Sequence, residues 1–199
     1  MLQEFVENVE RVCRDVMNEL HTALPGIIKS VDLSTGMATV SPAGFFKKPT
    51  GETIEYPKIS GVPIVMPQCV AAAIEFAFPV KAGDSCLIII SEMELDAWLC
   101  GEEADSELRY DLTNAICIPG LSSVAGSAFV EACKTDSAII ANGDVKLVLS
   151  PSGIAAYGDL KVYGNIISTA TVKAGKIDLK KHVHTSAEPG SESSEPKEA

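Results

Sequence analysis

The sequence has few basic residues. Its 16 Lys and Arg are outnumbered by 27 Asp and Glu, which gives a formal net charge of −11. A surface of that sign repels a phosphate backbone, so we do not expect nucleic-acid binding. Aromatic residues are also scarce at 6%, with Trp98 the single tryptophan, so the stacking platforms of single-strand binders are missing too.

Membrane and export signals are absent as well. No apolar run approaches the roughly 18 residues that a membrane-spanning helix needs. Glu4, Glu7 and Glu10 interrupt the stretch that a signal peptide would keep apolar. We therefore expect an acidic, soluble protein that is made in the cytoplasm. Its six cysteines are never closer than 14 residues, which excludes C-x-x-C motifs and predicts buried free thiols in a reducing compartment.

Signatures of catalysis are missing too. The chain has no G-x-S-x-G elbow, phosphate loop or dinucleotide fingerprint. Glu92, Glu94 and Asp96 would share one face of a strand, but nothing pairs them with a second carboxylate across a cleft. Asp84 is expected in a turn, and His21 is far in sequence from the other two histidines. We expect no catalytic residue and no small-molecule substrate.

Residues 1–24 are predicted to form an amphipathic helix that Pro25-Gly26 ends. Its apolar residues recur three and four positions apart, with charges between them. Such a stripe must pack against something. Its own domain, sister copies of the chain and a partner protein are all open at this point.

Residues 25–120 change to a period of two. Ile27–Asp32 and Met37–Val40 flank Ser34-Thr35-Gly36 as a strand, turn and strand. Further strands are predicted at Ile74–Phe78, Cys86–Ile90 and Ile116–Ile118. Five or six short strands without a second convincing helix predict a mainly β protein, with a small OB-like β-barrel in this segment.

Residues 121–184 alternate short β-prone pieces with turn signals such as Asn142-Gly143 and Gly158-Asp159. The pieces expected as strands are Ala138–Ile140, Val145–Leu149, Leu160–Tyr163 and Asn165–Ile167. Strands this short bury too little area within one chain, so identical copies are expected to share a core. Residues 185–199 are rich in Glu and Ser, lack large apolar residues and are expected to be a flexible acidic tail.

The only metal-like spacing is His182-Val183-His184. On a strand these imidazoles would point to the same face, about 6.5 Å apart at Cβ. One chain offers only two ligands. Three chains on a threefold axis would offer six nitrogens, which suits iron(II) or nickel better than zinc.

The order of several pieces resembles the central membrane-puncturing spikes of contractile phage tails and related injection machines. The resemblance covers roughly residues 24–184. It rests on Pro25–Ile28, Ile59–Ile64, Phe76–Asp84 followed by Leu87–Ile90, Asp96–Trp98, Tyr110–Ala115 and Pro119-Gly120. The motif at His182 and His184 matches the apex motif of that family.

The resemblance implies a homotrimer at the tail tip of a virion, assembled in the host cytoplasm. The barrel would dock beneath the tail hub and baseplate, and residues 121–184 would form an intertwined trimeric β-helix. At its tip, His182 and His184 of three chains would hold one Fe ion. Sheath contraction would drive this non-enzymatic needle through the host envelope, with transient contact to the outer membrane. The acidic tail departs from the short return expected after the apex, and no stretch is long enough for the lysozyme domain of some related spikes.

Two alternatives remain open, and a third is argued against. The spike could belong to a phage-derived bacteriocin or another contractile injection system. A different class would be a sugar-binding OB-like barrel with an oligomerising tail. An iron oxygenase of the cupin kind also uses H-x-H, but it needs a third histidine further along the chain, and only 15 polar residues follow His184.

Overall fold

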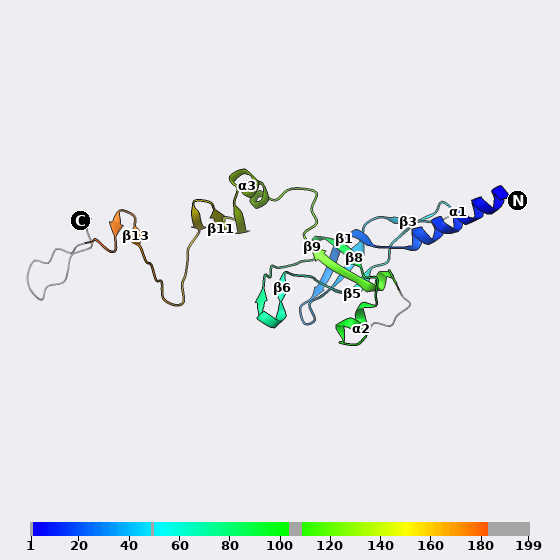
Figure 1. Cartoon of the computed structure of the whole chain (residues 1–199), viewed down its shortest axis with the longest axis horizontal. Coiled ribbons are helices and arrows are strands. Elements are labelled where there is room, and N and C mark those ends of the chain that lie inside the picture. The colour runs from blue at the N-terminus through cyan, green and yellow to red at the C-terminus, as the bar shows by residue number, and fades with distance from the viewer. Residues whose placement is uncertain (1, 49, 104–108, 183–199) are drawn as a thin grey trace, which may run out of the picture. The chain divides into compact units, whose positions relative to one another are not determined.

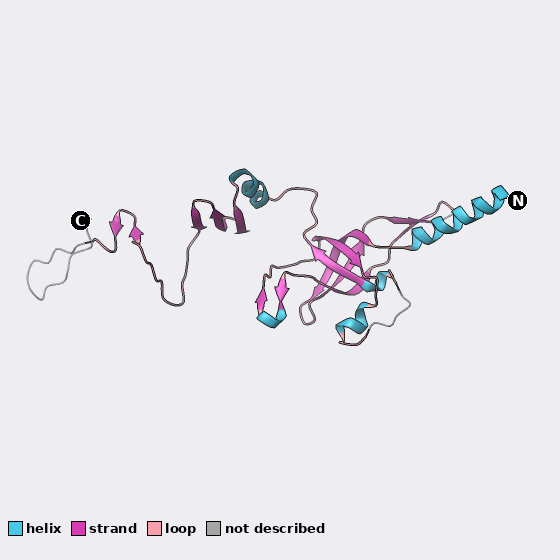
Figure 2. Cartoon of the chain, viewed as in Figure 1, coloured by secondary structure: helices cyan, strands magenta, loops and turns pink. Residues whose placement is uncertain are grey.

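The computed structural model describes residues 2–48, 50–103 and 109–182 and divides into two compact units, residues 1–125 and 126–199. Each unit is described by itself. Strands outnumber helices in the described chain, and a helix lies at its N-terminus (Figures 1 and 2). The expected mainly β fold with an N-terminal helix is confirmed, and the sheet of the first unit is curled, while the intertwined trimeric β-helix stays a prediction.

Helix α1 spans Leu2–Glu19 and therefore ends before the predicted boundary at residue 24. The reason is tertiary pairing. Strand β1 begins at Ala23, which pairs with Ile89, and the Ile90 N–H donates to the Thr22 carbonyl over 2.9 Å. Pro25 lies inside this strand and does not stop the helix, because the chain has already entered the sheet two residues earlier.

Five strands form one antiparallel sheet in the order β5-β2-β1-β8-β9. They are β1 (Ala23–Asp32), β2 (Met37–Pro42), β5 (Ile59–Pro63), β8 (Ser85–Ile90) and β9 (Ala115–Pro119). The predicted β1–β2 hairpin forms around Gly36, whose N–H donates to the Asp32 carbonyl over 2.8 Å. Asp32 also accepts from the Ser34 N–H and hydroxyl, and these hydrogen bonds lower the pKa of its carboxyl group.

The sheet curls until its two edges meet. An isolated parallel bridge joins Ile64, just after β5, to Cys117 of β9, and the Val65 N–H donates to the Cys117 carbonyl over 2.9 Å. A register shift between Ile28 and Ser30 marks a bulge in β1, and bulges bend and twist a strand. After the meander β1-β2-β5, the chain crosses over to place β8 beside β1, and β9 then meets β5 in parallel. This topology is the partly open Greek-key barrel of the OB type.

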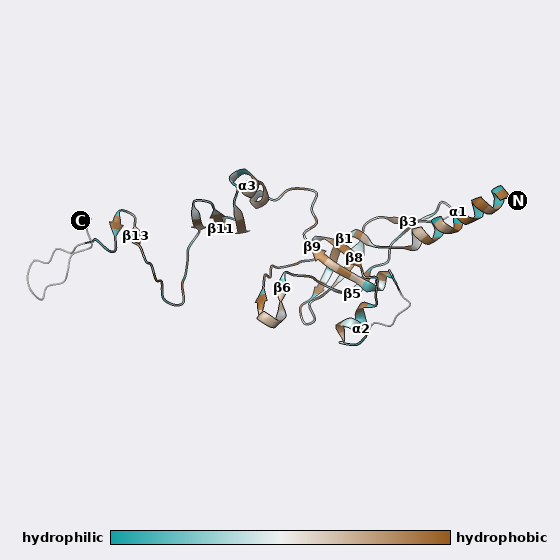
Figure 3. Cartoon of the chain, viewed as in Figure 1, coloured by the Kyte–Doolittle hydropathy of each residue, from teal (hydrophilic) through white to brown (hydrophobic). Residues whose placement is uncertain are grey.

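The core of this barrel comes from the alternating inward side chains of its strands. In β2 and β8 every second residue is buried. The core residues are Ile28, Ala38, Val40, Ile59, Val62, Cys86, Ile88, Ile90, Ala115 and Cys117. Figure 3 shows these strands as predominantly hydrophobic. The period of two in the sequence therefore located the core correctly.

Shorter elements surround the barrel. They are β3 (Phe45–Lys47), β4 (Thr53–Glu55), β6 (Gln68–Cys69), η1 (Val70–Ala72), β7 (Ile74–Glu75), α2 (Leu95–Leu99) and η2 (Leu112–Asn114). The strand predicted at Ile74–Phe78 is wrong beyond Glu75, because only its first two residues pair with β6. Asn114 is buried, and its side-chain oxygen accepts from the Leu95 N–H over 3.1 Å, which ties α2 to the sheet.

The second unit contains a helix, a three-stranded sheet and a small hairpin. These are α3 (Ser127–Thr135), β10 (Ala138–Asn142), β11 (Val145–Ser150), β12 (Gly153–Tyr157), β13 (Lys173–Ala174) and β14 (Ile177–Asp178). The expectation of a continuous β segment from residue 121 is therefore wrong at α3. Nine residues give about two and a half turns of helical pattern, which is too short to stand out from a β-prone background. The helix ends at Asp136, which takes the left-handed conformation at φ 49°.

Two predicted strands are not formed. Residues 160–163 and 165–167 run without ladder partners in the described chain. A strand exists only where a neighbouring strand receives its hydrogen bonds. The single chain supplies no such neighbour to these segments.

Candidate assembly surface and apex site

One face of the β10–β11–β12 sheet is almost entirely apolar and lies open. Ile140, Leu147 and Ala156 lie opposite one another across the three strands, so their side chains point to the same face. The same face also carries Ala138, Val145, Leu149 and Ile154. Within it, Val145 is 60% exposed and Ile154 is 73% exposed. We call these seven residues the open face. Contiguous apolar surface of this kind marks an interaction site.

Lys146 lies on the opposite side of the sheet from the open face and connects that side to α3. Its ammonium group forms an ion pair with Glu131 of α3, at 2.5 Å and 2.7 Å from the two carboxylate oxygens. The same ammonium lies 4.8 Å from the centre of the Tyr157 ring. A charge-assisted pair plus a cation–π contact fixes the helix against this side of the sheet. Among the described residues of this unit, the open face is therefore the side of the sheet without a covering helix.

The chain after β12 is also uncovered. Large apolar side chains between residues 158 and 172 are strongly exposed, including Leu160 at 76%, Tyr163 at 88% and Ile167 at 88%. Exposed large apolar side chains in such number are typical of an interaction surface.

His182 follows β14 in a turn. Its N–H donates to the Asp178 carbonyl over 2.8 Å, and its Nδ1 lies 2.8 Å from the Leu179 carbonyl oxygen. A carbonyl only accepts, so Nδ1 carries the proton and Nε2 carries the ring lone pair when the ring is neutral. Imidazoles that bind a metal ion are oriented in this manner, by a carbonyl on the other ring nitrogen. His182 thus fits the chemistry of a metal ligand.

His184, the second predicted ligand, lies outside the described residues, as does the predicted tail at 185–199. Within the described ranges, no three His, Cys, Asp or Glu side chains gather around a common point. Near His182, Asp178 accepts a short hydrogen bond from the Thr171 hydroxyl, which is the main cause of the lowered pKa of its carboxyl group.

The acidic residues considered for catalysis have structural roles. The Asp84 carboxylate accepts from the Lys81 N–H over 2.7 Å, as expected for a turn residue. Glu92 lies 3.5 Å from Arg109 in an exposed ion pair. Asp96 is in α2, so the idea that it shares a strand face with Glu92 is wrong. His21 packs edge-on against Tyr56 at 5.3 Å and lies in the other compact unit from His182.

The cysteines differ from expectation in their exposure. All six are free, but only Cys86 and Cys117 are buried. Burial raises the pKa of both thiols, that of Cys117 to about 12. Cys13, Cys69, Cys100 and Cys133 are exposed, because they lie on α1, α3 and the elements around the barrel. Apolar neighbours in sequence do not by themselves bury a thiol.

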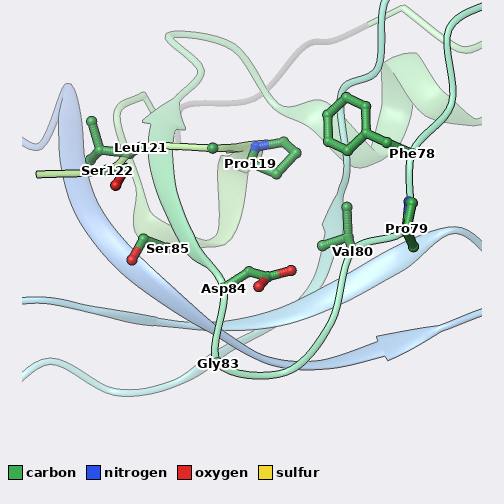
Figure 4. Close-up of a pocket in the computed structure, with 10 residues that line it drawn as sticks. Phe78, Pro79, Val80, Gly83, Asp84, Ser85, Pro119, Leu121 and Ser122 are labelled. Atoms are coloured by element: carbon green, nitrogen blue, oxygen red, sulfur yellow. The ribbon is translucent and has the colours of Figure 1, made fainter. Parts of the chain in front are cut away.

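A pocket of about 370 Å³ lies on the barrel where β8 begins and β9 ends (Figure 4). Phe78 and Val80 line it on one side, and Pro119 and Leu121 on another. Asp84 is its charged residue, and the Lys81 backbone already engages that carboxylate. The pocket is mainly a feature of the loop that leads into β8.

Sequence reasoning missed α3, Lys146 and Glu131. An available signal was the spacing of Ala128, Glu131 and Ala132, which suits a helix after Gly126. Among the described residues, no helix combines the length and the apolar character that a membrane crossing requires.

The fold and the open surfaces define a mainly β protein with an OB-type barrel and a second unit whose apolar side is uncovered. Residues 24–120, which make up just under half of the chain and cover the barrel except for the first residue of β1, match the family described as phage protein Gp138 N-terminal domain. No curated protein matches the chain. The barrel is thus similar to a phage protein domain, which supports a phage structural protein.

Proposed function

We propose that this protein is the central spike of a contractile phage tail. Three copies would cap the tail tube at the hub and be driven through the host envelope when the sheath contracts. One observation carries the proposal: a barrel that matches a phage protein domain is followed by a unit whose sheet leaves its apolar face open.

The open face gives the proposal its physical basis. Three copies that pack these faces against one another remove Val145, Leu147 and Ile154 from water in each chain. The segments at 160–163 and 165–167 would then find ladder partners in the neighbouring chains. Closure around a threefold axis leaves no free strand edge, so load is carried by hydrogen bonds and a shared core along the length of the needle.

The tip would be held by one iron ion. His182 and His184 of three chains would supply six imidazole nitrogens, a donor set that suits iron(II). The carbonyl contact at Nδ1 of His182 supports this assignment, because it directs the ring to coordinate through Nε2. The ion would perform no reaction. It would cross-link three chain ends, since coordination free energy is folding free energy at such a site.

The partners and the location of the protein follow from its proposed role as the spike. The barrel would dock on the hub and baseplate proteins, and the needle would contact the host outer membrane only in passage. The protein would act mechanically and not as an enzyme, without a small-molecule substrate. It would be found at the tail tip of the virion after assembly in the host cytoplasm.

The location is tested by labelling purified particles with gold-conjugated antibody against the barrel. We expect label at one end only, at the tip of the tail tube. Label along the sheath or on the head contradicts the proposal. Label at the tip of headless particles assigns the same role to a bacteriocin. Particles whose spike ends at residue 125 should assemble but fail to penetrate.

The apex is tested by metal analysis of the purified trimer. His182→Ala combined with His184→Ala should remove the one iron per three chains while the trimer survives through its shared sheet core. His21→Ala serves as the matched control and should leave the iron in place. Unchanged metal content in the double variant removes the apex assignment.

A further inference from the structure

Helix α1 carries a seven-residue apolar repeat along one side, broken only near its end. In heptad notation, three positions per repeat are apolar. They are Leu2, Val9 and Val16 at a, Phe5 and Val12 at d, and Val6 and Cys13 at e. We call these residues the α1 seam. The third d position is Glu19, the last residue of the helix.

The α1 seam is open in the single chain. Residues 2–17 are all exposed, and within the seam the exposure runs from 45% for Val9 to 80% for Leu2. Figure 3 shows hydrophobic and hydrophilic residues alternating along this helix. An isolated helix of this length is marginal in water, because most helical stability in proteins comes from packing of the apolar face. The seam therefore requires a partner, and it lies outside the phage domain matched at residues 24–120.

Charge argues against two kinds of partner. The helix carries five acidic residues and two arginines, whereas helices that lie on membrane surfaces are rich in Lys and Arg. Arg11 lies four residues from both Glu7 and Asp15, and Arg14 lies four residues from Glu10, so the basic charges are compensated within the helix. The polar side offers no unbalanced basic stripe to an anionic surface or an acidic protein.

We propose that the α1 seam packs against the same seam of two further copies as a parallel three-stranded coiled coil. A seven-residue repeat keeps the seam facing its partners along a left-handed supercoil, so the pattern fits copies of itself. The central core positions are β-branched at both a and d, namely Val9, Val12 and Val16. Branched residues at both positions favour three strands over two.

The inference rests on the proposed function, because the trimer formed by the second unit brings the helices together. Only residues 20–22 separate α1 from β1, so each helix remains close to its own barrel. Such tethering gives an effective concentration in the millimolar range. Two and a half heptads are too few for free peptides to associate, but at this effective concentration they suffice to form the coiled coil.

Disulfide trapping in the full-length chain tests the proposal. Cys13, Cys69, Cys100 and Cys133 are first replaced by Ser, which leaves only the buried Cys86 and Cys117. Val9→Cys then places a thiol at a core a position. Arg14→Cys is the matched control at an outer position of the same helix. Both variants are oxidised mildly, analysed on a denaturing gel and weighed in the native state.

Val9→Cys should give a covalent dimer at twice the chain mass of 21.0 kDa, with two of every three chains linked, while Arg14→Cys stays monomeric on the gel. A native trimer in which Val9→Cys does not cross-link overturns the coiled coil and leaves the spike proposal intact. Equal linking at both positions also overturns it. A native monomer that does not cross-link overturns both proposals.

Discussion

The two units show opposite uses of β-prone sequence. In the barrel, β8 lies between β1 and β9, and Ile88 is completely buried. In the second unit, β11 also lies between two neighbours, yet Leu147 at its centre is 38% exposed. Both strands have their hydrogen bonds, but only the barrel curls far enough for its sheet to cover its own apolar face.

The difference shows which contacts stabilise each unit. The barrel closes on itself through the bridge at Ile64 and Cys117, so its core is complete within one chain. In the second unit, Lys146 holds one side of the sheet to α3, while the open face on the other side is exposed in the described chain. Stability of the barrel should therefore not depend on protein concentration, whereas that of the second unit should.

The largest expected effect comes from a charge on the open face. Leu147→Asp would place a carboxylate where copies pack, at a cost of several kcal/mol for each chain. We expect loss of the oligomer in native mass or sedimentation measurements, with the barrel still folded by circular dichroism. Ser150→Asp, on the opposite side of the same strand, is the control and should keep the assembly. Identical oligomeric states in both variants would contradict the claim that the open face, and not the opposite side of the sheet, is where copies pack.

A smaller effect is expected in the barrel core. Ile88→Ala should lower the free energy of unfolding by about 2–5 kcal/mol, because it leaves a cavity among fully buried side chains. The change should appear in the urea transition that does not depend on protein concentration. Leu33→Ala, at a 92% exposed position beside the β1–β2 turn, should change it by no more than about 0.5 kcal/mol. Equal costs at the two positions would contradict the barrel core.

The smallest effect distinguishes two ion pairs. The side chains of Lys146 and Glu131 are 22% and 38% exposed, whereas those of Lys48 and Glu52 are 40% and 63% exposed. Glu131→Gln should cost about 1 kcal/mol in the stability of the second unit, because water screens this pair less. Glu52→Gln should cost the barrel only a few tenths. Thermal unfolding of both variants checks the order, and a larger loss for Glu52→Gln would reverse the argument.

Sequence patterns predicted the barrel better than its surroundings. The alternation in Met37–Val40 and Cys86–Ile90 encodes burial directly, since inward residues must be apolar. The end of α1 could not be predicted as well, because pairing of Ala23 with Ile89 depends on a strand more than 60 residues away. The sequence pattern therefore places the end of the helix at Pro25, although that residue lies inside β1.

The assembly surface was predictable only in outline. Short β-prone pieces after residue 120 correctly indicated a unit with little self-burial, but not which side would be covered. The covered side is the one on which α3 packs and Glu131 pairs with Lys146. A helix of nine residues leaves only a weak pattern in the sequence, so this side could not be predicted. The spacing of His182 and His184 was enough to propose them as metal ligands. In the proposed trimer the surroundings of these two residues would include the neighbouring copies, so a single sequence cannot predict them.

The central claim is that three chains share one core, and native mass spectrometry of the purified protein tests it most directly. The account predicts a particle of three chains of 21.0 kDa each, with an increment of about 56 Da for one bound iron. A trimer without that increment keeps the shared core and removes the iron apex. A monomer would contradict the account, because the open face would then have no copies to cover it.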